Sequence, residues 1–273
     1  MLTSPAVGSP RTQDFGAKET MNKLVVALVL VCGASLGTAS LASAQGAPWS
    51  DRAYINVGWG VESGSSAMTD TRRSTIYEEA STITSSNTFT SGSLFDVGLG
   101  LRIWKNLTVG AAYHQEQNDT DGTATGSIPS PIFFNRPRAL SAVEPLNRKE
   151  MATHLNVGWV VPFGEKFDVI VYGGPSFFRL VQDSISNVVP NEQGATSSTI
   201  SGTITKLERK KTATGYNAGV DATYIVWQND NLRLGAGGFV RFTQASTEVE
   251  MLTTSQPTDV GGVQFGFGAR LRF

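Results

Sequence analysis

Residues 259–273 decide the fold and read Asp-Val-Gly-Gly-Val-Gln-Phe-Gly-Phe-Gly-Ala-Arg-Leu-Arg-Phe. From Phe273 back to Val263 every second residue is apolar, and the residues between them are arginine, glycine or glutamine. This alternation predicts a β-strand with one apolar face and one polar, glycine-rich face. We expect the apolar face to point outward, toward lipid.

The same alternation recurs in seven further blocks: residues 53–61, 94–104, 107–115, 151–161, 167–178, 214–226 and 232–243. The chain has 273 residues, of which 29 are glycine and 16% are charged, and its net charge is −1. The composition favours many short strands over long helices, and the charge balance does not favour a nucleic-acid partner. One large all-β domain is therefore expected.

The connections between the blocks alternate in length. Those after the second, fourth and sixth blocks are only a few residues long, whereas the others are long and rich in Ser, Thr, Asn and Gly, at residues 62–93, 116–150, 179–213 and 244–258. Short and long connections that alternate with an even strand count are typical of an outer-membrane barrel. We predict an eight-stranded antiparallel up-and-down transmembrane β-barrel with short periplasmic turns and long extracellular loops.

Charge placement agrees with a lipid-facing apolar face. The outward positions of the eight blocks carry no charge if Arg179 lies at or beyond the rim, and a bulge at Pro175 would decide on which face Arg179 falls. An outward Arg or Lys near the bilayer midplane costs about 2–4 kcal/mol. The glycines on the opposite face are expected to make room for large side chains in a narrow bore.

The N-terminal region reads as a targeting segment. Residues 1–20 resemble an upstream mis-start, and residues 21–44 have the basic start, apolar run and Ala-Ser-Ala end of a cleaved signal peptide. The only cysteine, Cys32, lies in this segment, and Val31 before it argues against lipidation. We expect export, with residues 45–273 forming the outer-membrane barrel domain.

With these features, residues 45–273 resemble the small eight-stranded outer-membrane β-barrel proteins of Gram-negative bacteria, the OmpA-, OmpX- and OmpW-type barrels. The terminal Ala-Arg-Leu-Arg-Phe is similar to the aromatic signal that the barrel-assembly machinery recognises, which makes Phe273 the expected assembly signal. The resemblance implies a cell outer membrane location, contact with outer-membrane lipid and lipopolysaccharide, and a monomer. It leaves the activity open.

The inward charges and histidines form a predicted polar network in the bore, either a gate or a plug. Its members are Asp96, Arg102, His114, His154, Asp168, Asp221, Arg233, Arg241, Arg270 and Arg272. We place Asp96, Asp221 and Arg241 in the middle to outer bore and the other charged members toward the periplasmic end. The two histidines are interpreted as hydrogen-bonded bore residues rather than as a catalytic or metal pair.

Two features of the long connections are candidates for contacts at the surface. Ile132, Phe133 and Phe134 form an apolar patch that either binds a partner or packs against its own loop. The basic segment 207–211 either contacts lipopolysaccharide phosphates or is a charged loop-to-strand junction. No phosphate-binding or dinucleotide motif is present, so no cofactor is expected.

The sequence thus predicts a non-enzymatic envelope barrel, either structural or a narrow conduit for small or hydrophobic solutes. The alternatives are a surface adhesion or binding module carried by the long loops and, third, a membrane-embedded lipid-modifying enzyme.

Overall fold

The computed structural model describes residues 50–192 and 196–273. Within these residues no helix is long and apolar enough to cross a membrane. The expected mis-start, signal peptide and cleavage site lie outside the described residues. The elements are β1 (Ala53–Ser63), β2 (Ser66–Ile76), β3 (Glu79–Phe89), β4 (Gly92–Trp104), β5 (Leu107–Ile128), β6 (Arg138–Pro162), β7 (Phe167–Pro190), β8 (Thr199–Gln228), β9 (Arg233–Glu250), β10 (Ser255–Val260) and β11 (Val263–Arg272).

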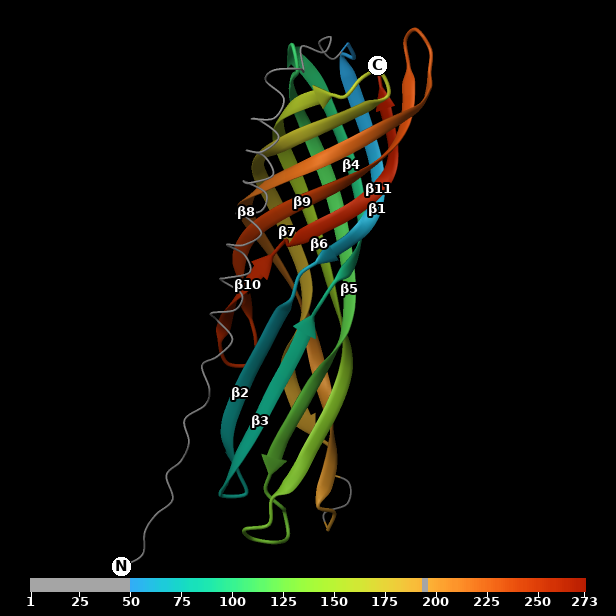
Figure 1. The fold of residues 1–273 in the computed structure, drawn as a ribbon. Helices are drawn as coiled ribbons and strands as arrows, with labels where there is room; N and C mark the ends of the chain where they lie inside the picture. The colour runs from blue at the N-terminus through green and yellow to red at the C-terminus, as the bar shows by residue number, and fades with distance from the viewer. Residues whose placement is uncertain (1–49, 193–195) are drawn as a thin grey trace, which may run out of the picture. The chain divides into compact units, whose positions relative to one another are not determined.

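Eight of these strands form a closed ring in which every neighbour is antiparallel. The order around the ring is β1, β4, β5, β6, β7, β8, β9 and β11, and β11 pairs with β1 to close it. The strands cross the wall at a steep tilt, as closure of a sheet requires (Figure 1). The predicted eight-stranded up-and-down barrel is confirmed.

The short turns lie at one end of the barrel, which we call the short-turn end. Lys105 turns β4 into β5 with a positive φ of 45°, and Gly164 with a φ of 81° lies between β6 and β7. The start of β1 and the end of β11 lie at the same end, because the Phe273 carbonyl accepts hydrogen bonds from the Arg52 and Ala53 amides, each at 2.6 Å. Both ends of the described barrel are therefore held together here.

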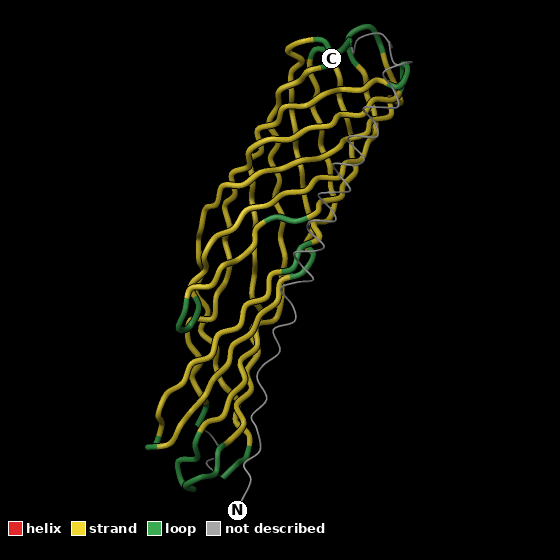
Figure 2. The backbone as a smooth tube through the Cα atoms, turned by 60° about the vertical axis from the view of Figure 1, so that its left-hand side comes forward, coloured by secondary structure: helices red, strands yellow, loops and turns green. Residues whose placement is uncertain are grey.

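The opposite end, which we call the extended end, is built mostly from strand. Most residues of the four long connections form strand that continues the barrel wall. Strands β5 to β8 each have 22 to 30 residues, and the β2–β3 hairpin pairs with β5. Figure 2 shows strand running far into this end, with loops at the tips and a few short loops midway. The predicted blocks end too early in these strands, because polar residues interrupt the apolar face of the extensions, as is typical of a loop.

Burial follows the predicted two faces. Outward residues such as Leu99, Val157 and Phe267 are exposed, while the inward charged residues away from the short-turn rim are buried. The β7–β8 register runs without a shift through Pro175, and the bulge in this pair lies instead at Ile185/Asn187. Arg179 therefore points outward, at the level of Met151 at the edge of the fourth block.

Glycines on the inward face lie beneath large side chains. A methyl group added at Gly100 would come within 2.4 Å of the Tyr54 ring, and one at Gly266 would come equally close to the Phe239 ring. In these places the bore has room for the aromatic ring only because the opposite residue has no side chain. The predicted reason for the glycine-rich face is confirmed at these positions.

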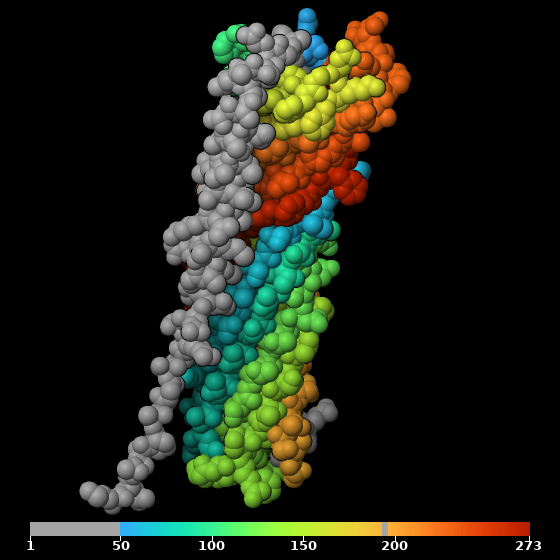
Figure 3. Space-filling model, in the orientation of Figure 1, coloured from blue at the N-terminus to red at the C-terminus, as the bar shows by residue number. Residues whose placement is uncertain are grey.

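The interior of the extended end is apolar. Its buried cluster is made of residues from β2, β3, β5 to β10 and the turn between β9 and β10, among them Met68, Ile83, Phe89, Ile128, Leu140, Leu146, Leu180, Ile185 and Val249. Two hydrogen bonds join β2 to the β9–β10 turn, because Thr253 donates from its amide and hydroxyl to the Asp70 carboxylate at 2.6 and 2.5 Å. On the face drawn in Figure 3, β9 and β11 (orange and red) cover the half with the short turns, and β2, β3 and β5 (teal to green) cover the other half.

Candidate functional site in the bore

Moving from the short-turn end toward the extended end, the first polar layer in the bore is built on β11. Arg270 donates to both oxygens of Asp221, at 3.1 and 2.7 Å. Arg272 donates to Thr223 at 2.6 Å and lies 3.5 Å from Asp168. All of these side chains are buried, so each charge is neutralised across the bore at close range.

One placement in this layer differs from the prediction. Asp221 was expected with Asp96 and Arg241 in the middle to outer bore, but it pairs with Arg270 and lies 3.9 Å from Arg272. The long side chain of Arg270 on β11 reaches past β9 to Asp221 on β8, so Asp221 belongs to this first layer. Two residues of the predicted polar network lie at the rim of the short-turn end. Arg233 pairs with Asp51 at 3.2 Å, and Arg102 is half-buried at the end of β4.

The second layer joins β4, β9 and β11. Arg241 donates to Asp96 and to Gln264, both at 2.5 Å. The guanidinium also lies 5.3 Å from the centre of the Phe239 ring, which fills the bore beside it. Gln264, which was not among the predicted bore residues, is fully buried. It links Arg241 to Glu62, because its amide nitrogen lies 2.6 Å from the Glu62 carboxylate.

The two histidines stack beside this layer and form a chain of hydrogen bonds. His114 Nδ1 lies 2.8 Å from His154 Nε2, and His154 Nδ1 lies 2.7 Å from Ser176 Oγ. Asn217 donates to the same hydroxyl at 3.0 Å. Both histidines are thus hydrogen-bonded in the bore, and Ser176 is a partner that could not be assigned from the sequence because the register beyond Pro175 was open.

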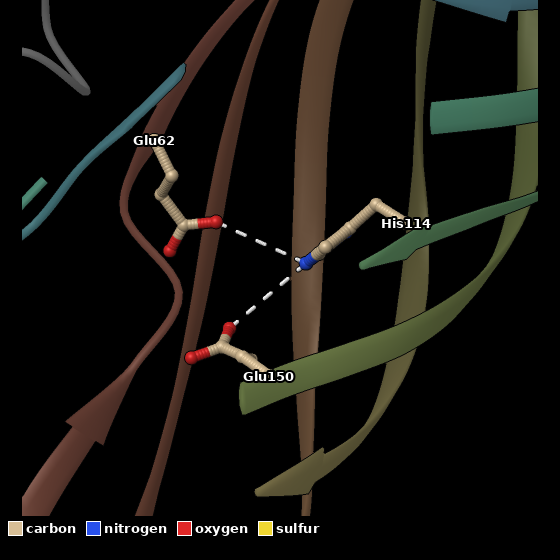
Figure 4. Close-up of side chains that lie close together, drawn as sticks. All are labelled: Glu62, His114 and Glu150. Atoms are coloured by element: carbon tan, nitrogen blue, oxygen red, sulfur yellow. Dashed lines mark ion pairs between the residues drawn. The ribbon is translucent and has the colours of Figure 1, made fainter. Parts of the chain in front are cut away.

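A third layer of carboxylates lies where the bore meets the apolar cluster. Glu62, Glu116 and Glu150 are buried here with Arg148, whose guanidinium donates to Glu150 Oε2 at 3.3 Å. Figure 4 shows Glu62 and Glu150 pointing at His114 from separate strands. Each of the three carboxylates lies one residue outside a predicted block, where inward alternation continues, so none of them was among the predicted bore residues.

Burial perturbs the acids of this layer, which lie beyond the predicted membrane-spanning blocks. Loss of hydration raises the pKa of Glu116 to about 7, and the nearby Glu62 carboxylate adds to the shift while Arg148 opposes it. Burial also raises the pKa of Glu62 and of Glu150 above the ordinary value. Three acids share one guanidinium, so the layer holds a surplus of negative charge that needs protons or a cation.

The remaining candidates lie at the two ends of the barrel. Phe273 is exposed beside the β1–β11 closure, and its role as an assembly signal stays a prediction. Ile132, Phe133 and Phe134 are 60%, 43% and 73% exposed at a tip of the extended end, and the Phe133 ring contacts Arg136 of its own loop. Segment 207–211 lies inside β8 rather than at a loop junction, and its cations Arg209, Lys210 and Lys211 pair with Glu208 or Glu250.

Comparison with known proteins places the chain in one class. The family model described as outer membrane protein beta-barrel domain matches residues 28–273. No curated protein sequence matches. Solved structures with a similar fold include Neisserial surface protein A (13% identity, 81% of this chain and 97% of that chain, TM-score 0.39).

Two further similar structures are OprG from Pseudomonas aeruginosa (11% identity, 84% and 98% covered, TM-score 0.40) and Ail of Yersinia pestis (8% identity, 81% and 99% covered, TM-score 0.34). At these scores the likeness supports no inference about function.

Proposed function

Because the chain belongs to the outer membrane protein beta-barrel domain family, we propose that it is a structural barrel of the outer membrane whose bore is sealed. The short-turn end is then periplasmic and the extended end extracellular. The observation that carries the proposal is the filling of the bore: Arg241, Arg270 and Arg272 are at most 1% exposed, and each is ion-paired across it.

The apolar cluster supports the same proposal. It fills the extracellular half with side chains such as Met68, Phe89 and Leu146, each at most 2% exposed. A hydrated ion that passed the paired arginines would have to enter this dry region, where a charge is strongly disfavoured. Two barriers of different chemistry therefore lie in series along the bore.

Planar-bilayer recording tests the sealed bore. The purified chain and its Arg241→Ala variant are both expected to be silent, because the Arg270–Asp221 layer and the apolar cluster still close the bore in the variant. A general porin recorded under the same conditions controls for insertion. Discrete openings of the unmodified chain would overturn the proposal in favour of a conduit.

A non-enzymatic role is part of the proposal. Ser176, His154 and His114 are ordered like a nucleophile with two bases, but all three are completely buried. A lipid or peptide substrate would have to reach Ser176 through the filled bore. Unchanged lipid profiles of cells that express the chain or its His154→Ala variant are the expected result, and a change that depends on His154 would contradict it.

One specific observation favours a second function, which is surface binding. Ile132, Phe133 and Phe134 expose apolar side chains at the extracellular tip, and Phe133 is flanked by Arg136 at 5.6 Å. An exposed apolar group beside a cation is suited to a protein surface. Replacing the three residues by serine should reduce attachment of expressing cells to protein-coated surfaces, and Val189→Ser, an exposed apolar site elsewhere at this end, should not.

A further inference from the structure

We propose that Glu62, His114 and Glu150 bind a divalent transition-metal ion of the Zn²⁺ class within the carboxylate layer. The three residues come from β1, β5 and β6, and one ligand atom from each lies within 4.8 Å of the other two. His114 Nε2 lies 3.8 Å from Glu62 Oε2 and 4.0 Å from Glu150 Oε1. Figure 4 shows the three groups converging on one point.

These spacings are close to those of a bound ion. Zinc–ligand bonds of about 2.0–2.2 Å place neighbouring ligand atoms roughly 3.3–3.5 Å apart in a tetrahedral site. The two distances from His114 Nε2 would shorten by about 0.5 Å, which a glutamate side chain can supply by small rotations. The imidazole and carboxylate donor set also suits first-row transition ions better than Mg²⁺ or Ca²⁺, which prefer oxygen alone.

An unpartnered oxygen independently points to a ligand. Glu150 Oε1 is buried and has no hydrogen-bond partner among the described residues, whereas Oε2 of the same carboxylate is bonded to Arg148. Buried carboxylate oxygens are nearly always satisfied, and an exception calls for a missing partner. The oxygen without a partner is the one directed at His114 Nε2.

The local charge fits a dication. When ionised, Glu62, Glu116 and Glu150 carry three negative charges against the single positive charge of Arg148. Arg241 also lies close, 3.4 Å from His114 Nδ1, but its charge is neutralised by Asp96. A divalent ion would cancel the surplus of two negative charges in a place where water cannot screen it.

The surroundings of His114 resemble the support that metal-bound histidines have. With Nε2 on the ion, Nδ1 carries the proton and donates to His154, whose own Nδ1 donates to Ser176. Such outer partners fix the tautomer and the ring orientation of a ligating histidine. Gln264 keeps its 2.6 Å contact with Glu62, and the weaker contact at 3.3 Å to His114 Nε2 is given up when the ion binds.

A small cavity lies beside the two proposed glutamate ligands. It has a volume of about 30 Å³ and borders Glu62, Glu116, Arg148 and Glu150, but not His114. This volume accommodates one water molecule next to the carboxylates. The ion would then tie β1, β5 and β6 together between the polar bore and the apolar cluster.

Zinc titration of the untagged chain, purified from membranes in detergent, tests the site. Calorimetry should give about one Zn²⁺ per chain and thermal melting should shift upward. Glu150→Gln and His114→Gln should each weaken Zn²⁺ binding at least about tenfold. Glu116→Gln is the matched control, because it removes a buried acid of the same layer that is not a ligand. It lowers the surplus negative charge by one and should weaken Zn²⁺ binding clearly less than either ligand variant.

Two outcomes would overturn the site: no Zn²⁺ bound by the unmodified chain, or equal binding by all three variants, which would indicate adventitious surface binding. If a variant does not fold, the nitrogen resonances of the histidines in the unmodified chain decide the matter. Zn²⁺ should shift the His114 Nε2 resonance, and an unchanged resonance at saturating Zn²⁺ would reject the proposal.

Discussion

Arg241 on β9 lies 2.5 Å from Asp96 on β4, and the two residues are 145 positions apart in the chain. Both side chains are buried in the bore. Their pairing therefore joins two strands that are separated in the wall by β1 and β11, and it leaves each charge dependent on the other.

We expect Arg241→Met to destabilise the barrel strongly, by about 3–5 kcal/mol, because it leaves the Asp96 carboxylate buried without its partner. The double variant Arg241→Met with Asp96→Leu should recover much of the loss, since both charges are then absent. Urea unfolding in lipid vesicles, followed by tryptophan fluorescence, measures the difference. A double variant as unstable as the sum of the two single ones would show that the pair is not coupled.

Gly100→Ala should cost about 1–3 kcal/mol, because the added methyl group would come within 2.4 Å of the Tyr54 ring. Gly98→Ala, two residues away on the same inward face, is the control: its methyl group would approach nothing closer than 3.6 Å. Unfolding free energies of the two variants can be compared directly. Equal losses would mean that conformational preference rather than the Tyr54 ring explains the glycine.

Phe267→Arg should destabilise the barrel by about 2–4 kcal/mol, because Phe267 lies on the outward face in the middle of β11, where the side chain meets acyl chains. The same change at Val143, which is outward and exposed in the extended end, should cost about 0–1 kcal/mol. Unfolding in vesicles of a single lipid measures both. Similar costs at the two positions would argue against the assignment of the lipid-facing belt.

The Thr253 amide should titrate with the Asp70 carboxylate at a pH below the ordinary aspartate value of about 3.9. Burial acts to raise the pKa of Asp70, but the hydrogen bonds from Thr253 outweigh it, so the pKa is lowered. The bonds between β2 and the β9–β10 turn therefore contribute stability above the ordinary value and lose it as the pH falls through the lowered pKa.

Proton chemical shifts of Thr253 between pH 2 and 6 give the midpoint of this titration. The Asp70→Asn variant should show no titration at this amide and should be cleaved faster by protease within residues 251–254. A midpoint at or above the ordinary value would contradict the prediction.

The periodicity of the sequence is sufficient to predict the ring of strands and the face on which each bore residue lies. Period-two alternation needs no knowledge of distant contacts, so Leu99 and Asp96 could be assigned to opposite faces directly. Strand length was harder to predict. The extensions of β5 and β8 carry Ser and Thr outward, into water, and this composition does not distinguish a solvated strand from a loop.

Pairings across the bore could not be predicted, because they depend on strand tilt and on how far a long side chain reaches. Arg270 meets Asp221 over an intervening strand, which the residue spacing does not reveal. A related reason applies to Glu62, Glu116 and Glu150. The predicted blocks end where the outward face loses its apolar residues, but the strands continue and keep placing residues on the inward face. Following the two faces separately would have found these acids.

The closure between β1 and β11 sets a condition on how the protein is made. Tyr54 pairs with Arg272, and the Arg52 amide with the Phe273 carbonyl, so the final contacts join residues more than 200 positions apart. A nascent chain that is still on the ribosome lacks β11, so its sheet has two unpaired edges. Contacts between residues so far apart in the chain also form slowly. Truncation by even a few C-terminal residues should therefore leave an unsealed sheet that is prone to aggregate before it reaches the bilayer.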